Sequence, residues 1–268
     1  MQALHTAATG MAAQELNVQV ISNNIANLRT TGFKRQTASF QDLIYEHIRR
    51  VGAQASDQGT ILPVGIDIGG GVKTVGTPRT MTQGTLSQTG NDLDLAITGE
   101  GFFKIQMPDG TFQYTRDGTF SMDNTGRIVN AQGNPVQPTI TIPQNASGLT
   151  VNAQGQVSVT LPGSTNTSTV IGQIGLTRFI NKGGLQPVGN NLFTDTPSSG
   201  PPQDGLATAE GFGTINQGSL EQANVDVVSE MSDLIAAQRA YEMNAKVITA
   251  ADQMMQSATA LFLSLIHI

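Results

Sequence analysis

The chain carries, at residues 4–28, the stretch LHTAATGMAAQELNVQVISNNIANL, which decides how its first part folds. One row of residues recurs every seven positions, at Leu4, Met11, Val18 and Ile25. A second row follows three positions behind it, at Ala7, Gln14, Ile21 and Leu28. Two mostly apolar rows with a period of seven are typical of a helix that packs along a narrow seam. Gly32 predicts the end of this helix.

The same period returns toward the other end of the chain. It runs through Val227, Leu234, Tyr241, Ile248, Met255 and Phe262. A second row contains Met231 and Ala245, with Gln238 and Asp252 as polar interruptions. We expect Asn224 to cap this helix and Asp226 to lie in its first turn, where a carboxylate suits the helix dipole.

Helix breakers separate these two stretches. All 11 Pro lie between Pro63 and Pro202, and every Gly except Gly10 lies between Gly32 and Gly218. Either stripe alone fits an amphipathic helix lying on a globular core. Because both ends carry narrow seams, we expect two long helices that pair with each other or with neighbouring copies.

The middle of the chain has the pattern of antiparallel β-structure. Residues 101–107 and 111–115 are apolar and β-prone, and Pro108-Asp-Gly110 between them predicts a turn. Strands at short spacing with frequent Gly and Pro indicate a small barrel or sandwich. The predicted fold class is therefore α+β, with a discontinuous coiled-coil-like pair of terminal helices around a central antiparallel β-rich domain.

Residues 35–85 fit neither pattern and are predicted to form an extended arm. Their Gly-rich part is nearly free of charge, yet its apolar residues need a surface to cover them. The contacts expected to lie along adjacent subunits are Ile61, Val64, Ile66 and Ile68. The expected layout is a helix at 1–34, the arm at 35–85, a β-domain at 86–208, and a return segment with the second helix at 209–262.

Composition argues against several functional classes. Charged residues make up 13% of the chain, against a usual share of about 25%. The formal charge of −6 argues against binding to nucleic acid. The three histidines show no metal-ligand spacing, and no phosphate-binding or nucleophile motif occurs. We therefore expect no enzyme activity, no cofactor and no metal. The one basic cluster, at Arg29, Lys34, Arg35, Arg49 and Arg50, is expected to be a solvated face, with contact to an anionic cell-wall polymer or to neighbouring subunits as the alternative.

The chain has no Cys, and its first basic residue is Arg29. A cleaved signal peptide and a membrane-inserted segment are both unexpected. Export from the cytoplasm would then need another route.

Three ordered motifs resemble those of the flagellar basal-body rod and hook proteins. Residues 21–35, ISNNIANLRTTGFKR, resemble the N-terminal motif of that family. Residues 223–246 resemble the C-terminal motif, and residues 95–118 are similar to the shared β-domain. The motif residues are Ser22, Asn23, Asn24, Asn27, Gly32, Phe33, Asn224, Gln238, Arg239, Tyr241 and Asn244. Within the family, residues 52–63 look most like the distal-rod branch, and the proximal rod proteins and hook protein are the alternatives.

The resemblance implies a structural role. Family members are exported unfolded through the flagellar type III apparatus and polymerise helically, with paired terminal helices inside and the β-domain outside. The distal rod crosses the periplasm inside the peptidoglycan and outer-membrane rings, and carries torque from motor to hook. The implied partners are the chain itself, proximal rod proteins, the hook protein, the ring proteins and the export apparatus.

Residues 263–268 have no counterpart in the resemblance and are expected to be a non-native tail. A different class of protein, a secreted β-rich adhesin or binding module with helical ends for oligomerisation, remains an alternative. Such a protein would need an export signal and aromatic or charged anchors, whereas aromatic residues make up only 5% of this chain.

Overall fold

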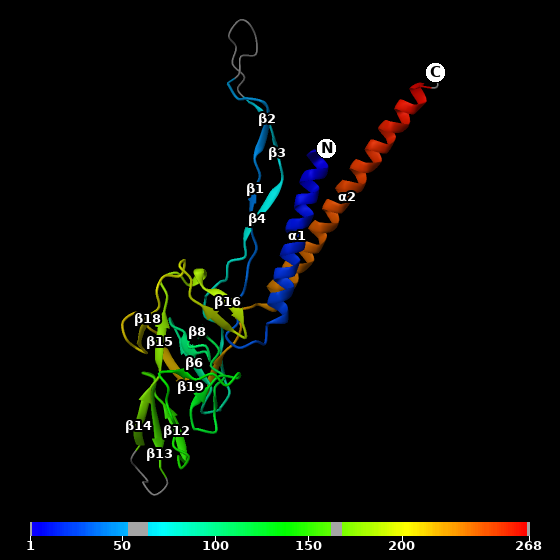
Figure 1. Cartoon of the computed structure of the whole chain (residues 1–268). Coiled ribbons are helices and arrows are strands. Elements are labelled where there is room, and N and C mark those ends of the chain that lie inside the picture. Colours follow the sequence, from blue (N-terminus) through cyan, green and yellow to red (C-terminus); the bar gives the residue numbers. More distant parts are fainter. Residues whose placement is uncertain (1, 53–63, 162–167, 267–268) are drawn as a thin grey trace. The chain divides into compact units, whose positions relative to one another are not determined.

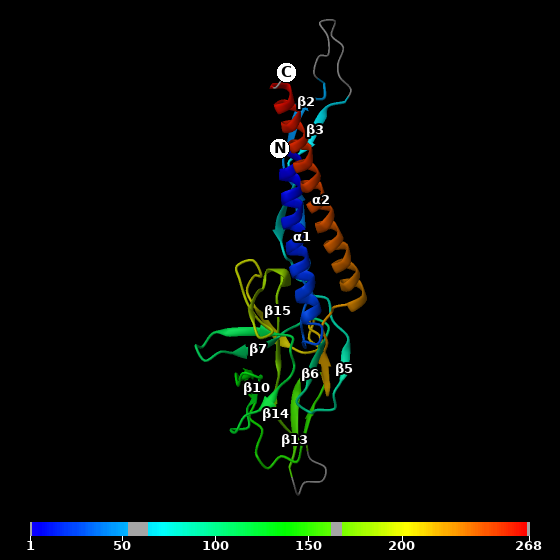
Figure 2. The same ribbon diagram turned by 90° about the vertical axis from the view of Figure 1, so that its right-hand side faces the viewer.

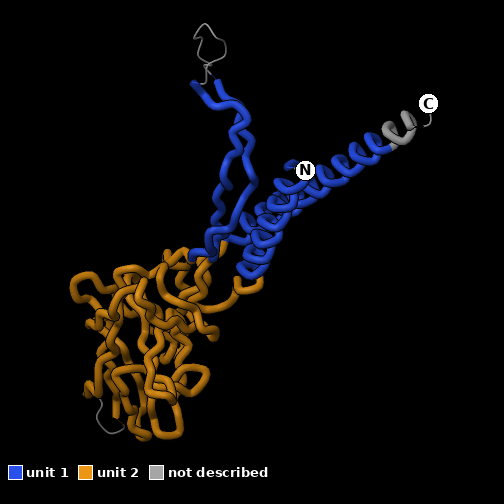
Figure 3. The backbone as a smooth tube through the Cα atoms, turned by 45° about the horizontal axis from the view of Figure 1, so that its top comes forward, with its two compact units in different colours: residues 1–25, 36–78, 226–268 blue, residues 26–35, 79–225 orange. Residues whose placement is uncertain are grey.

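The structure is a computed structural model that describes residues 2–52, 64–161 and 168–266 (Figure 1). Ile61 and nearly all of the stretch 52–63 lie outside the described residues, as do residues 267 and 268 of the expected tail. The chain divides into two compact units (Figure 3). Unit 1 contains residues 1–25, 36–78 and 226–268, and unit 2 contains residues 26–35 and 79–225.

Unit 1 contains both long helices, α1 (Gln2–Ala26) and α2 (Val227–Ile266). They lie side by side and run in opposite directions, as both views show (Figures 1 and 2). The predicted pairing of the terminal helices is therefore confirmed.

The residue that caps α2 is Asp226, so the prediction of Asn224 as the cap was wrong. The carboxylate of Asp226 accepts hydrogen bonds from Val228 N at 3.1 Å and from Ser229 Oγ at 3.3 Å. Asp226 satisfies a backbone donor that the first helical turn leaves unpaired. The side chain of Asn224 is used elsewhere, within unit 2.

Most of the predicted arm folds back on itself as a two-stranded antiparallel ribbon in unit 1. Its strands are β1 (Ser39–Asp42), β2 (Tyr45–Arg49), β3 (Ile66–Gly69) and β4 (Val72–Gly76). β1 pairs with β4 and β2 with β3, so the backbone groups of each side find partners on the other. Residues 79–85 belong to unit 2.

Unit 2 is built from short antiparallel strands. The first half of the set is β5 (Leu86–Gln88), β6 (Leu95–Thr98), β7 (Phe103–Gln106), β8 (Phe112–Thr115), β9 (Ser121–Met122), β10 (Ile128–Val129), β11 (Val136–Gln137) and β12 (Gly148–Val151). The second half is β13 (Gln156–Thr160), β14 (Ser168–Gln173), β15 (Gly175–Arg178), the 3₁₀ turn η1 (Lys182–Gly184), β16 (Gln186–Gly189), β17 (Leu192–Thr194), β18 (Gln203–Leu206), β19 (Thr214–Gln217) and β20 (Ser219–Glu221).

These strands form several small sheets. The largest has the order β11-β7-β8-β17-β16, a second has the order β12-β13-β14, and pairs such as β19–β6 and β20–β5 complete the unit. The predicted antiparallel β-domain and the α+β class are confirmed. Among the described strands the sheets do not close into a barrel.

Two clusters form the core of unit 2. The larger consists mainly of aliphatic residues such as Ile97, Val157 and Leu176, together with Phe103 and Phe120. The smaller is aromatic, and the rings of Tyr114 and Phe179 meet edge to face with centroids 4.7 Å apart. Burial, with a contribution from Asp195 and Asp204, raises the pKa of Tyr114 to about 12.

Candidate functional site

The two helices of unit 1 meet along a seam of small and polar residues. Asn24 Nδ2 donates to Glu230 Oε2 at 3.1 Å, and both side chains are buried. Gly10 lies so close to α2 that a Cβ atom there would come within 2.9 Å of the Asn244 amide. The two contacts are fourteen residues apart on each helix, so they share one antiparallel register.

The predicted seam residues lie beside this line of closest approach. On α1, Ile21 is buried, while Leu4, Met11, Val18 and Ile25 are half-buried; Leu28 is half-buried within unit 2. On α2, Leu234 and Ile248 are half-buried, whereas Val227, Tyr241 and Met255 are exposed.

The sequence reasoning missed the row of α2 that is buried. That row consists of Glu230, Ala237, Asn244 and Ala251, of which Asn244 is half-buried and the others are buried. In the row that we expected to be second, Met231, Gln238 and Asp252 are exposed and Ala245 is half-buried. A search for large apolar residues cannot detect a row of Ala, Asn and Glu. The signal that could have revealed it is the seven-residue spacing of these four positions.

Outside its buried row, α2 exposes large apolar residues. This outer stripe consists of Val228, Met231, Ile235, Met243, Val247 and Met254, all of them exposed. α2 therefore carries large apolar side chains that α1 of the same chain does not cover. A surface of this kind usually marks an interface.

The ribbon presents a second exposed apolar surface. We define the ribbon patch as Ile44, Tyr45, Ile48, Val51, Val64, Ile66, Ile68 and Val75, all exposed. Ile44 is the extreme case, with 90% of its side chain accessible. Of the arm contacts predicted from sequence, Val64, Ile66 and Ile68 thus lie on an open surface.

The middle of the ribbon, where β1–β4 gives way to β2–β3, is held on α1 of the same chain. Val72 N donates to Thr9 Oγ1 at 3.3 Å, and Thr9 Oγ1 donates to Thr6 O at 2.9 Å. Gly71 has a φ of +113°, and a Cβ there would come within 2.3 Å of Thr9 Oγ1. Gly71 is therefore required for this close approach.

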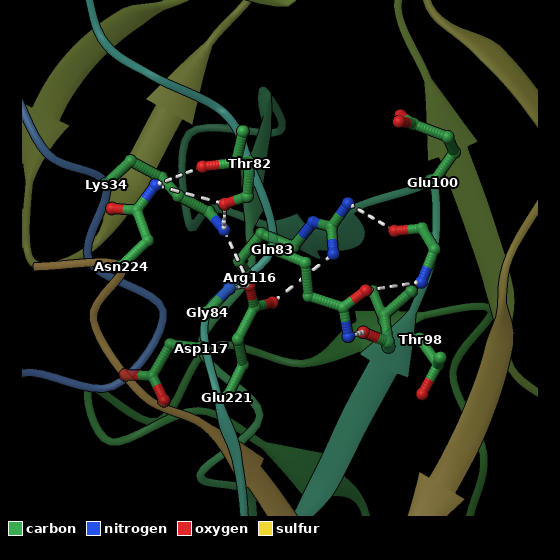
Figure 4. Close-up of polar contacts among 12 residues, drawn as sticks. Lys34, Thr82, Gln83, Gly84, Thr98, Glu100, Arg116, Asp117, Glu221 and Asn224 are labelled. Carbon is green, nitrogen blue, oxygen red and sulfur yellow. Dashed lines mark hydrogen bonds and ion pairs between the residues drawn. The ribbon is translucent and has the colours of Figure 1, made fainter.

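Within unit 2, a buried cluster of charged side chains joins the N-terminal motif to the return strand β20 (Figure 4). Glu221 Oε1 accepts hydrogen bonds from Lys34 Nζ at 2.6 Å and from Gly84 N at 2.9 Å. Glu221 Oε2 faces Arg116 Nη1 at 3.3 Å. We call Lys34, Arg116 and Glu221 the ionic cluster.

Lys34 corrects the prediction of a solvated basic face. Its side chain is only 1% exposed, and its ammonium also donates to Thr82 O at 2.8 Å. Arg35 is half-buried, whereas Arg29, Arg49 and Arg50 are exposed as expected. Burial lowers the pKa of Lys34, and the carboxylate of Glu221 opposes that shift. Burial likewise lowers the pKa of the Arg116 guanidinium.

Two motif residues fix the backbone of unit 2. Gly32, at a φ of +66°, donates its N–H to Glu221 O at 2.8 Å. Asn224 Oδ1 accepts from Arg35 N at 2.7 Å, and Asn224 Nδ2 donates to Thr80 O at 2.8 Å. The amide of Asn224 thus connects three separate stretches of chain.

The remaining motif residues have varied surroundings. Phe33 is buried beneath the Arg79 guanidinium, which lies 5.8 Å from the ring centroid. Asn27 O accepts from Thr30 N at 3.0 Å, where α1 ends. Ser22 and Asn23 are exposed on α1, and Gln238 and Arg239 are exposed on α2.

Neither a metal site nor a membrane span is found in the part of the chain that the structure describes. No three His, Cys, Asp or Glu side chains among these residues could together hold a metal ion. None of the described helices has the length and hydropathy to cross a membrane.

Comparison with known proteins gives matches along nearly the whole chain. Three family models match: "Flagella basal body rod protein" at residues 4–34, "Flagellar hook protein FlgE/F/G D1 domain" at 96–159, and "Flagellar basal body rod FlgEFG protein C-terminal" at 216–261. The first and third models include the helices of unit 1, and the second lies within unit 2.

Three relatives are each named flagellar basal-body rod protein FlgG. The protein of Caulobacter vibrioides is 53% identical over 97% of this chain and 99% of its own length. That of Borreliella burgdorferi is 44% identical over 97% and 98%, and that of Bacillus subtilis is 36% identical over 96% and 97%. The resemblance found in the sequence is confirmed, and the chain belongs to the FlgG family of flagellar basal-body rod proteins.

Proposed function

We propose that this chain is the structural subunit of the distal rod, and that it polymerises helically into the shaft that transmits torque from motor to hook. The observation that carries the proposal is the pair of uncovered apolar surfaces in unit 1, the outer stripe of α2 and the ribbon patch. An interface that joins unlike surfaces and does not close produces a helical polymer. Neighbouring copies are therefore the natural cover for both surfaces.

The named relatives support the choice within the family. Proteins named FlgG match this chain over nearly its full length and theirs. This favours the distal rod over the alternatives of a proximal rod or hook subunit. A secreted adhesin has no comparable support.

The finer assignments follow from that choice. The proposed partners are further copies of this chain, proximal rod proteins, the hook protein, the peptidoglycan and outer-membrane ring proteins, and the type III export apparatus. The proposed location is the rod that spans the periplasm. In this role the protein catalyses nothing and needs no cofactor.

The proposal also gives the ribbon a role. Its middle is held to α1 by Thr9 and Val72, while its exposed apolar residues point to a further contact. We propose that the ribbon patch lies along adjacent subunits, locks them together and keeps the rod straight.

The test changes the helix seam and follows assembly. Ile248→Asp places a carboxylate in the half-buried flank of α2, at a cost of several kcal/mol if the charge is buried on assembly. We expect the variant to disappear from purified basal bodies and to abolish motility, while unit 2 stays folded. Ile248→Leu keeps the volume and the apolar character, and should be recovered in basal bodies like the wild type. Recovery of Ile248→Asp in normal amounts would contradict a buried seam.

A further inference from the structure

The ionic cluster brings two cations and one carboxylate into the interior of unit 2. The side chain of Glu221 is 0% exposed, and those of Lys34 and Arg116 are 1% and 3% exposed. Arg116 is held further by Gly99 O, which accepts from its Nη2 at 2.7 Å, and by the ring of Phe102 at 5.2 Å. Both cations are thus fixed by unit 2 itself, and Glu221 is the carboxylate that lies between them.

The two cations depend on that carboxylate. Charges taken out of water destabilise a protein strongly unless they are paired, and two like charges add their mutual repulsion. Without Glu221, the burial of Lys34 and Arg116 would leave two unpaired cations. Glu100 contributes some attraction, but it is exposed at the surface.

The order of these residues along the chain shows which part of unit 2 supplies the counter-ion. Glu221 follows Lys34 by 187 residues and Arg116 by 105 residues. It is carried by β20, the last strand of unit 2, which pairs with β5 through Glu221 and Leu86. Both cations therefore precede their counter-ion in the chain, and Glu221 comes from the last part of unit 2.

We infer that Glu221 acts as a counter-ion lock, so that the whole of unit 2 folds only when β20 has delivered its carboxylate between Lys34 and Arg116. With this lock, folding of the β-domain depends on docking of the return segment that leads into α2. A chain whose return segment has not yet docked does not present a finished β-domain. Its physical basis is charge compensation, which separates it from simple packing by β20.

The first test measures coupling between charges in the full chain. Three variants are compared with the wild type by hydrogen exchange at β7 and β8: Glu221→Gln, Lys34→Met, and the double variant. Glu221→Gln leaves both buried cations unpaired and should reduce protection by about 100-fold or more. The double variant buries one cation fewer, so protection should recover by about tenfold or more relative to Glu221→Gln.

The sign of the coupling between Lys34→Met and Glu221→Gln distinguishes charge compensation from simple packing. If Glu221 only fills space and accepts hydrogen bonds, Lys34→Met adds its own loss, and the double variant is less protected than Glu221→Gln. That result would overturn the inference. Lys104 and Asp204 provide the matched control, since they form an ion pair at 2.6 Å whose carboxylate is 56% exposed. Lys104→Met and Asp204→Asn should have small and nearly additive effects.

The second test follows the order of folding. In pulse-labelled refolding of the wild type, amides of β7 and β8 should become protected together with those of β5 and β20. Protection of β7 and β8 well before β20 would contradict the lock. The triple variant Lys34→Met/Arg116→Met/Glu221→Gln removes all three charges. It should keep the fold, because no buried charge is left without a counter-ion, and β7 and β8 should no longer become protected together with β20.

Discussion

Asn24 and Glu230 are 206 residues apart in the sequence, and they share a hydrogen bond of 3.1 Å inside the helix pair. The amide of Asn24 also bonds the backbone of Gln36, through Nδ2 to Gln36 O at 2.8 Å and Oδ1 to Gln36 N at 3.0 Å. A buried polar contact in a helix seam costs stability, but it selects one register over its neighbours, because a slipped register leaves the polar groups unpaired. The Asn24–Glu230 pair therefore fixes how α1 and α2 line up.

A disulfide can test this register. Asn17 lies midway between Gly10 and Asn24, and Ala237 lies midway between Glu230 and Asn244, so the two should face each other. The chain has no Cys of its own, so any cross-link must come from the introduced pair. We expect Asn17→Cys/Ala237→Cys to form an intramolecular disulfide in the assembled protein, visible as a mobility shift on non-reducing gels. The control Asn17→Cys/Asn244→Cys is one heptad out of register and should stay reduced. The opposite pattern would place the register elsewhere.

The helices are expected to be ordered only on assembly. Their seam of Ala, Gly and Asn buries little apolar area. Because helix nucleation is unfavourable, neither helix is expected to be stable by itself. In a verified monomer, hydrogen exchange should find α1 and α2 unprotected. Residues 26–35 and 219–225 should be protected, because they belong to unit 2. Strong protection of both helices in the monomer would refute this expectation.

The sequence was sufficient for the types and order of the main elements. The seven-residue period predicted both helices and their pairing, and Asp109-Gly110 predicted the turn between β7 and β8. Gly110 does adopt a φ of +84°, and its N–H bonds Met107 O at 3.0 Å. These features depend on local propensity and periodicity, which a single sequence records.

The polar contacts of Asn224 and Lys34 could not be predicted from the sequence in the same way. Asn224 has the composition of a helix cap, but its amide joins Arg35 and Thr80, which come from distant parts of the sequence. Lys34 looks like a surface cation until Glu221 is brought beside it. Such contacts depend on tertiary proximity, and the sequence around each residue carries no sign of its partner.

Gly32 should be among the least replaceable residues of unit 2. A Cβ there would come within 2.7 Å of both Arg116 C and Asp117 N, in addition to the strain of a φ of +66°. Gly110 has a similar φ of +84° but nothing within 4 Å of its Cβ position, so it isolates the conformational cost. We expect Gly110→Ala to lose about 1–2 kcal/mol of unfolding free energy, and Gly32→Ala to lose about 1–3 kcal/mol more from overpacking.

Urea unfolding can measure this difference within unit 2. The chain has no Trp and three Tyr, of which Tyr114 lies in unit 2. In a Tyr45→Phe/Tyr241→Phe background, the near-UV signal of Tyr114 reports on that unit alone. Equal midpoints for the two Gly→Ala variants would show that the backbone around Arg116 moves aside at no cost.

Deletion of residues 52–70 tests the proposed role of the ribbon. The deletion removes Val64, Ile66 and Ile68 from the ribbon patch and none of unit 2. Subunits should still assemble, and electron microscopy should show axial structures that are bent or more flexible. Normal hydrogen exchange at β7 and β8 serves as the folding control. Straight rods of unchanged stiffness would mean that the segment is an ordinary surface loop.

The hydrogen bond from Thr89 N to Gly218 O, at 2.8 Å, has a consequence for how this chain can vary. Residues 89–218 begin and end side by side, next to the pairing of β5 with β20, and Arg116 within them also enters the ionic cluster. Such a segment behaves as a cassette, in which the turns that lie away from Arg116 can change in length without displacing the strands that hold its ends. Insertions within the cassette, for example an epitope tag at the open turn of Gly110, can thus be made without altering the path of the chain into either long helix.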